Sequence, residues 1–313
     1  MQQALALDVP TLPQLPREDP AEFMLPEALA GLPGLSFDRE GRTTVDPVAW
    51  ASGAKEFGRR LDAALGGDGL ATFEPPGSSC RAWKPFLWEI EQRKAPFAKA
   101  QVAGPLTTLW ASSLADGRPL SAVPGLGAQI VRLVVARALA MTAAIKSTGA
   151  TPILFLDEPG LYAFDKRIPT HVVELQELSF AIQALRKAGA IVGLHCCSNT
   201  NWAMILGLEF DIVSADTRLS LAPMLGTGAV LDTYLARGGW LGLGIIPTNS
   251  ALRPPVEDVV AEALTTMGDK RRAILARSVL SPACGLALRS VAEVEQIFDE
   301  LHVAQQLIRA NAG

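Results

Sequence analysis

The chain has 313 residues, of which 49% are hydrophobic and 19% are charged, with a mean hydropathy of +0.23. This composition excludes an intrinsically disordered chain and leaves enough apolar residues for a large core. The formal net charge of -4 excludes a basic surplus, so we predict neither a nucleic-acid partner nor binding to an anionic membrane.

The sequence predicts a cytoplasmic protein with reduced cysteines. No uninterrupted apolar run approaches the roughly 18 to 20 residues of a membrane span, and residues 1–10 lack the basic start and apolar core of a secretory signal. The chain has four cysteines, too few for a dense disulfide framework, and Cys196 and Cys197 are adjacent. We therefore expect free thiols, whose role is metal binding, catalysis or burial.

Short apolar runs that end in turn or polar residues alternate with longer helical stretches, which is typical of a parallel β-sheet with helical connections. Amphipathic helices are predicted over residues 123–147, 172–189 and 291–309, and residues 7–16 are a weaker candidate for a strand. The chain length suits one TIM-type (β/α)8 barrel, of which seven strands are then visible. The six clearer strands cover residues 97–105, 152–159, 190–197, 211–217, 240–248 and 278–286.

Polar side chains gather where these predicted strands end. In a parallel barrel all carboxyl ends of the strands lie on one face, and active sites are built on that face. We therefore expect these side chains to lie near one another and to form the functional site. They are Asp157, Glu158, His195, Cys197, Asp216 and Cys284.

The segment IVGLHCCSNTNW, residues 191–202, places scarce ligand types at the tip of a strand. His195 and Cys197 share one side of the strand and Cys196 faces away, because neighbouring side chains alternate. One imidazole and one thiolate suit zinc, Cys284 can add a second thiolate, and Asp216 can add an oxygen or leave that position to a substrate. Taken alone, these residues also fit buried structural cysteines and a hydrogen-bonded histidine.

Four segments together resemble a known superfamily, which includes cobalamin-independent methionine synthase, the methylcobamide:coenzyme M methyltransferases and uroporphyrinogen decarboxylase. VAGPLTTLW (102–110) is similar to its GPxT strand end and FLDEPGL (155–161) to its DEP strand. LHCCSNTNW (194–202) resembles its HxC metal segment, and SPACGL (281–286) its last Cys-Gly strand. The resemblance implies one (β/α)8 barrel over residues 1–313, like the C-terminal barrel of the methionine synthase.

The resemblance also implies roles for the residues at the strand ends. His195, Cys197 and Cys284 match the zinc ligands of the methyltransferase branch. Asp216 occupies the place of the family's glutamate ligand, with one methylene fewer. Asp157 and Glu158 match a position that anchors the ammonium group of the substrate. The alternative for this last pair is a cap of the following helix or an ion pair with an arginine such as Arg167. Gly104 and Thr107 are expected to form a tight turn and a helix cap.

The implied activity is that of a zinc-dependent thiol methyltransferase. Zinc would hold a small thiol, such as homocysteine or coenzyme M, as a thiolate that attacks an electrophilic methyl group. Residues 243–250 contain no histidine, whereas the matching strand of methionine synthase carries a catalytic one. We therefore expect a corrinoid protein or free methylcobalamin as methyl donor rather than methyltetrahydrofolate.

Two other functions stay open. The first is a non-catalytic barrel that binds a small thiol or a metal. The second is a decarboxylase similar to uroporphyrinogen decarboxylase, which needs no metal and holds its substrate with arginines, and which leaves Cys197 and Cys284 unexplained. The sequence also opens with MQQALALDVPTLPQLP and lacks the family's glycine-serine-proline strand. We therefore expect a missing or atypical first strand. Either the barrel is open there, and an edge partner or a homodimer could cover the exposed edge, or the true start lies upstream.

Overall fold

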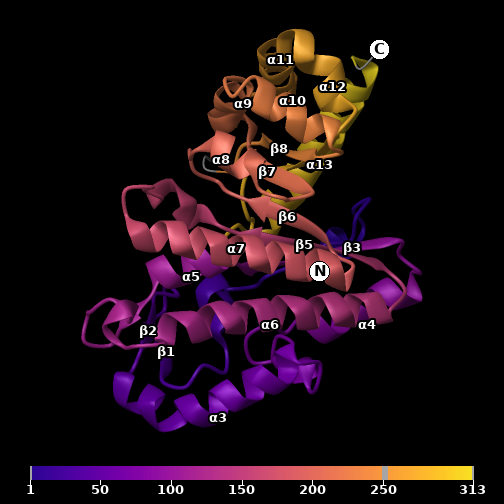
Figure 1. The fold of residues 1–313 in the computed structure, drawn as a ribbon. Helices are drawn as coiled ribbons and strands as arrows, with labels where there is room; N and C mark the ends of the chain where they lie inside the picture. Colours follow the sequence, from indigo (N-terminus) through magenta and orange to yellow (C-terminus); the bar gives the residue numbers. More distant parts are fainter. Residues whose placement is uncertain (1, 249–252, 312–313) are drawn as a thin grey trace. The chain divides into compact units, whose positions relative to one another are not determined.

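The computed structural model describes residues 2–248 and 253–311 of the chain. These residues form two compact units (Figure 1). The first unit comprises residues 1–160 and 165–192, and the second comprises residues 161–164 and 193–313.

Two long parallel strands begin the main sheet in the first unit. β3 (Phe97–Ala103) and β5 (Thr151–Asp157) pair along their whole lengths. Residues 7–16 form no strand beside β3, and contribute only an isolated parallel bridge between Thr11 and Lys99. The prediction of a seventh strand there is wrong, because prolines at 10, 13 and 16 have no N–H to donate and a ladder cannot extend through them.

A small second sheet in the first unit was not predicted. β1 (Leu35–Phe37) pairs antiparallel with β2 (Thr43–Val45), and β2 pairs parallel with β4 (Ser113–Leu114). Each strand has two or three residues, which is too short for an alternating pattern to stand out from the neighbouring loops.

Helices of the first unit enclose an apolar core that joins this small sheet to α3 and α6. Trp50, Phe57 and Leu61 of α3 pack in one cluster with Val45 of β2 and Leu133 of α6. By length and composition α6 is the one helix among the described residues that could cross a membrane, but 61% of its apolar window is buried in the protein, as in a core helix. The helices are α1 (Gln2–Leu5), α2 (Met24–Leu29), α3 (Pro47–Leu65), α4 (Trp83–Gln92), α5 (Pro105–Ala111), α6 (Leu126–Ser147) and α7 (Pro169–Ala188).

The second unit contains four parallel strands connected by helices, with pairing between β6 and β7, β7 and β8, and β8 and β9. Its last helix begins with a capping box, in which Ser290 and Glu293 exchange side-chain and backbone hydrogen bonds. The strands are β6 (Ile191–His195), β7 (Ile212–Asp216), β8 (Trp240–Ile246) and β9 (Ser278–Pro282). The helices are α8 (Trp202–Gly207), α9 (Thr217–Leu225), α10 (Ala229–Ala236), α11 (Val256–Met267), α12 (Arg271–Leu275) and α13 (Val291–Ala310).

The six parallel strands follow the order β3-β5-β6-β7-β8-β9, which is also their order along the chain. Helices connect the successive strands. The chain is therefore an α/β protein with a fold of the TIM-barrel type, as the sequence predicts. The six clearer strands and the three predicted helices are confirmed within a few residues of their ends, and the described residues provide six strands where a full barrel has eight.

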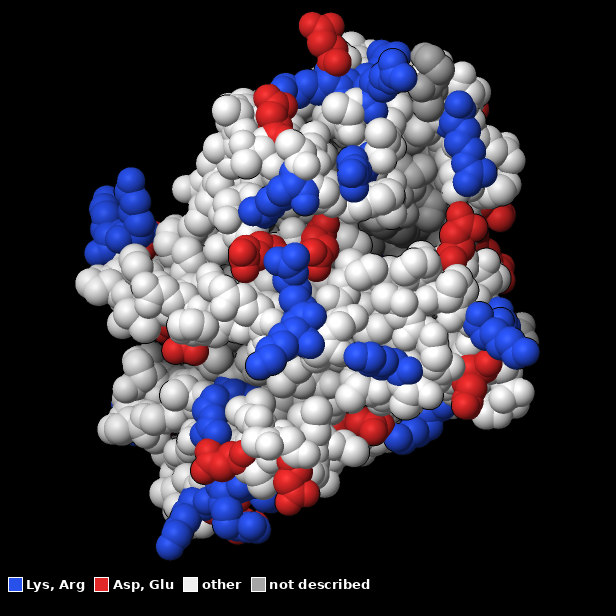
Figure 2. Space-filling view, turned by 45° about the vertical axis from the view of Figure 1, so that its right-hand side comes forward, with Lys and Arg blue, Asp and Glu red and all other residues white. Residues whose placement is uncertain are grey.

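Charges of both signs are interspersed on the face shown in Figure 2. Among the described residues, several charged side chains form short ion pairs, such as Arg218 with Glu262 at 3.1 Å and Arg167 with Asp165 at 2.6 Å. No area of one sign dominates that face, and the expectation that nucleic acid is not a partner stays a prediction.

A buried carboxyl group in the first unit links stability to pH. Glu27 of α2 is 1% exposed and accepts a hydrogen bond of 2.6 Å from Nε2 of Gln14. Burial raises the pKa of Glu27 to about 8, even though the hydrogen bond from Gln14 and the charge of Arg137 oppose this increase. At neutral pH the folded chain therefore holds a proton here that the unfolded chain releases.

We expect Glu27→Gln to remove part of the pH dependence of stability. A raised folded pKa contributes stability that is full below the unfolded value near 4.5 and is lost as the pH rises to about 8. Between these values the contribution of Glu27 falls by at most about 1.4 kcal/mol per pH unit. Urea unfolding of both proteins at pH 5 and pH 8 tests this, and equal losses of stability in the two proteins would contradict it.

Candidate metal centre

Three residues that are distant in the chain meet in the second unit. His195 is the last residue of β6, Cys197 follows it by two positions, and Cys284 comes two residues after the end of β9. One ligand atom from each lies within 4.8 Å of the other two. The histidine and Cys197 are partly buried, whereas Cys284 is exposed. One nitrogen and two sulfurs thus converge at the carboxyl ends of parallel strands.

The pairing of the strands accounts for this convergence. His195 lies opposite Ser214 in the register of β6 and β7, and the N–H of Cys196 donates to the carbonyl oxygen of Ser214 at 3.1 Å. At the other end of the unit the pairing of β8 with β9 is irregular between Gly244 and Ile246. An irregularity of this kind redirects the end of a strand. The loop that follows β9 carries Cys284.

The His195 ring has one nitrogen engaged and one available. Nδ1 lies 3.3 Å from Oγ of Ser214, whereas Nε2 is buried and has no hydrogen-bond partner among the described residues. A buried polar atom without a partner is unfavourable unless a ligand satisfies it. With Nδ1 beside the hydroxyl of Ser214, Nε2 is the ring nitrogen that remains for a metal ion.

The two cysteines of the His-Cys-Cys segment have different surroundings. The Cys284 thiol, and secondly the His195 ring, lower the pKa of Cys197 below that of a free thiol, which favours the thiolate form. Cys196 is fully buried, its Sγ lies 3.4 Å from the carbonyl oxygen of Ser198, and it is outside the cluster.

The donor atoms of the cluster are those that zinc prefers, and the spacing between them is close to that around a zinc ion. A tetrahedral zinc ion has Zn–S distances of about 2.3 Å and Zn–N distances of about 2.0 to 2.1 Å, so its ligand atoms lie roughly 3.5 to 3.8 Å apart. The present limit of 4.8 Å exceeds this spacing by about one ångström, which side-chain rotation can supply. Cysteine and histidine are also the common ligands of zinc.

Asp216 is not among the three clustered residues. It is the last residue of β7 and the N-cap of α9, where its Oδ1 accepts from the N–H groups of Arg218 at 2.9 Å and Leu219 at 3.3 Å. This is the usual role of an aspartate that directly precedes a helix. The helix cap accounts for Asp216 without a metal.

Glu158 is fully buried in the first unit and is surrounded by hydrogen-bond donors from the start of α5. Its Oε1 accepts from the N–H of Leu106 at 3.0 Å, and its Oε2 accepts from the N–H of Thr107 at 2.6 Å and from Oγ1 of Thr107 at 2.7 Å. Burial raises the pKa of Glu158 to about 7 against these hydrogen bonds. Both carboxyl oxygens are thus engaged by the start of α5, which precedes Glu158 in the chain, and not by the following helix that the sequence alternative named.

The GPxT and DEP segments form one structural unit around this carboxyl group. At Gly104 a Cβ atom would lie 2.6 Å from Cγ of Glu158 and closer still to its carboxyl group, so only glycine fits. Thr107 also accepts a hydrogen bond of 3.0 Å from the N–H of Gly160. Asp157, beside Glu158, is the partly buried last residue of β5, and its carbonyl oxygen accepts from the N–H of Gly104 at 2.8 Å.

One residue beside the cluster, Ser214, was not predicted from the sequence, and part of one predicted segment lies outside the described residues. Ser214 was not singled out, although it precedes Asp216 by two positions and shares its side of the strand, which is a usable signal. The segment without a histidine covers residues 243–250, of which 249 and 250 lie outside the described residues.

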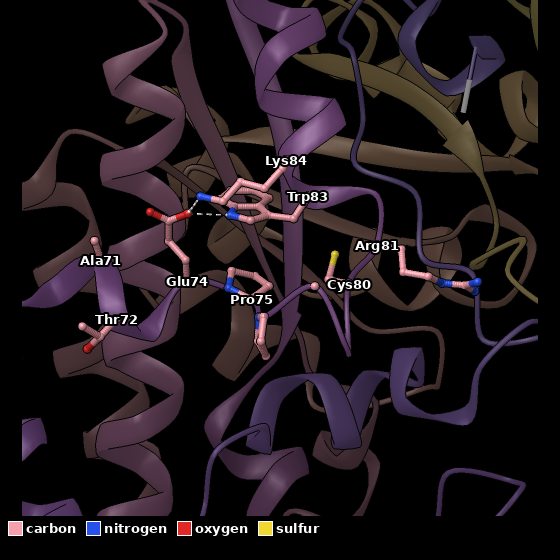
Figure 3. A pocket seen from close by; sticks show the side chains of 10 residues that line it. Ala71, Thr72, Glu74, Pro75, Cys80, Arg81, Trp83 and Lys84 are labelled. Carbon is pink, nitrogen blue, oxygen red and sulfur yellow. Dashed lines mark hydrogen bonds and ion pairs between the residues drawn. The ribbon is translucent and has the colours of Figure 1, made fainter.

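A hollow of about 480 Å³ lies in the first unit and has none of the predicted site residues in its described lining. Figure 3 shows Glu74 at its side, where the carboxylate accepts from Nε1 of Trp83 at 2.8 Å and pairs with Nζ of Lys84 at 2.6 Å. These three side chains satisfy one another.

Comparison with solved structures identifies similar folds. A B12-independent methionine synthase from Shewanella sp. W3-18-1, solved in complex with selenomethionine, has a TM-score of 0.53 and 14% identity, over 73% of this chain and 67% of that one. A Listeria monocytogenes protein assigned as a vitamin-B12-independent methionine synthase has a TM-score of 0.48 and 16% identity, over 74% and 69%. No protein-family model and no curated protein matches the chain. At this identity the first likeness supports the barrel fold alone.

Proposed function

We propose that the chain is a zinc-dependent methyltransferase whose acceptor is a small thiol. The observation that carries the proposal is the convergence of His195, Cys197 and Cys284 within 4.8 Å of one another. These are the residues that the sequence resemblance assigns to the zinc site, and the fold that brings them together is shared with a methionine synthase. The nature of the donor atoms and the buried Nε2 of His195 support zinc as the ion.

The residues of the chain would perform distinct tasks. His195, Cys197 and Cys284 would hold the ion, and Asp216 would leave the fourth position to the substrate. When bound, zinc would supply acidity to the substrate thiol, whose pKa near 8.5 otherwise keeps it protonated at neutral pH. Asp157 remains the proposed anchor for an ammonium group of the substrate, whereas the hydrogen bonds of Glu158 favour a structural role.

A methyl-corrinoid remains the proposed donor. In the transfer, the sulfur electron pair forms the new S–C bond, the electron pair of the C–Co bond stays on the corrinoid, and the thiol proton passes to solvent.

A cytoplasmic location and a homodimer also stay proposals.

A donor and acceptor panel tests the proposal directly. Purified, zinc-loaded protein should be incubated with methylcobalamin or methyltetrahydrofolate, each with homocysteine or coenzyme M, and the methylated thiol quantified. We expect product from methylcobalamin and none with Cys197→Ser. Product from folate alone would overturn the donor assignment. No product from any pair, with zinc bound, would instead support a non-catalytic thiol or metal binder.

The role assigned to Asp216 predicts that Asp216→Asn binds zinc as the unchanged protein does. Asparagine caps a helix about as well as aspartate, so the start of α9 is preserved while a carboxylate ligand would be lost. Competition with a chromogenic chelator measures the affinity. A fall of more than about tenfold, the least that loss of a metal-supporting group usually produces, would make Asp216 a ligand.

A further inference from the structure

The environment of His195 contains a second interaction that bears on metal binding. The ring can bind a metal ion through only one nitrogen at a time, and which nitrogen carries the proton is set by the partner of the other. Here Nδ1 faces the hydroxyl of Ser214 at 3.3 Å, and Nε2 is the buried nitrogen without a partner among the described residues.

Ser214 is held in place by its neighbours on both sides. It is 5% exposed, lies opposite His195 of β6, and lies opposite Gly242 of β8. A Cβ atom at residue 242 would lie 2.5 Å from Cβ of Ser214 and 2.7 Å from its Oγ. Glycine at 242 therefore provides the space that the serine side chain occupies.

We propose that Ser214 is a positioning residue that selects the tautomer of His195. Its Oγ accepts the Nδ1–H of the ring, so that the lone pair of Nε2 is directed to the ion shared with Cys197 and Cys284. The expected effect of Ser214 on zinc affinity rests on the proposed function, because it requires zinc to bind at His195. The choice of tautomer itself is a property of the metal-free protein.

Two measurements on Ser214→Ala test this role. The first is zinc affinity by chelator competition, where loss of an outer hydrogen bond to a ligand histidine lowers affinity by about 10- to 100-fold. The matched control is Ser220→Ala in α9, which also removes a buried serine hydroxyl. Unlike Ser214, Ser220 has no hydrogen-bond partner for its hydroxyl among the described residues. We expect the control to bind zinc as the unchanged protein does.

The second measurement is the proton position on His195 in the metal-free protein, by nitrogen-15 correlation spectra of the imidazole. The chain has three histidines, so substitution of the other two assigns the signals. We expect protonated Nδ1 in the unchanged protein and in Ser220→Ala, and a mixture of tautomers in Ser214→Ala. Thermal unfolding of both variants checks that they are folded.

The outcomes separate the two claims. Protonated Nε2 in the unchanged protein, or an unchanged tautomer and zinc affinity in Ser214→Ala, would overturn the role of Ser214. Absence of zinc binding in the unchanged protein would overturn the proposed function, whereas the tautomer measurement on metal-free protein would still decide the role of Ser214.

Discussion

Replacing Cys197 or Cys284 by serine is expected to abolish stoichiometric zinc binding. Each substitution removes one of the two sulfurs of the cluster, and serine does not ionise at neutral pH to replace the thiolate. Because removal of an outer-shell partner already lowers metal affinity by about 10- to 100-fold, we expect loss of a ligand to lower it by more than about 100-fold. Metal analysis after dialysis and chelator competition measure both quantities.

Cys196→Ser is the matched control, because it makes the same chemical change at the neighbouring position. Cys196 is buried and its sulfur faces the carbonyl oxygen of Ser198, so we expect zinc binding to be preserved. Zinc at 100 times its Kd should also stabilise the unchanged protein by about 2.7 kcal/mol, and this gain should vanish in the Cys197 and Cys284 variants. Equal zinc loss in all three variants would contradict the assignment.

The second large effect is expected from Glu158→Ala, which should lower the free energy of unfolding by at least about 3 kcal/mol. The substitution leaves the N–H groups of Leu106 and Thr107 without their acceptor in a buried place and creates a cavity. A residue that only anchors substrate would instead change KM and leave stability intact. Urea unfolding in the absence of substrate separates the two roles.

Gly104→Ala provides an internal check on that argument. Alone it should also destabilise the protein strongly, since the new methyl group overlaps the Glu158 side chain. Once Glu158 is alanine, the overlap is gone, so the double variant should be clearly more stable than the sum of the two single effects predicts. Additive effects would show that the two residues act independently.

The fold and the clustering of His195, Cys197 and Cys284 were predictable because both follow from periodicity, whereas their assignment as zinc ligands follows only from the resemblance to the methyltransferase superfamily. Alternation along β6 places His195 and Cys197 on one side, and the common direction of parallel strands brings Cys284 to the same end. Those two rules need only the identity of residues and the bounds of strands. Cys196 is correspondingly buried and outside the cluster.

The assignment of the acidic residues was not predictable in the same way. For Glu158 the sequence left a helix cap or a substrate site open, and for Asp216 it did not indicate the helix cap that the structure shows. The outcome depends on which N–H groups lie within hydrogen-bond distance of each carboxylate. That geometry is set by the turns after β7 and β5 rather than by any sequence pattern. Residues 7–16 form no strand although their apolar residues favour one, because the prolines in this segment cannot donate to a ladder.

The most direct test of the central claim is zinc K-edge X-ray absorption of the protein loaded with one equivalent of zinc. We predict two sulfurs at about 2.3 Å and one imidazole nitrogen at about 2.0 to 2.1 Å, with one further light atom. One sulfur should disappear from the spectrum if any zinc remains bound to Cys284→Ser. A first shell that contains only nitrogen and oxygen in the unchanged protein would contradict the assignment of His195, Cys197 and Cys284 as the metal site.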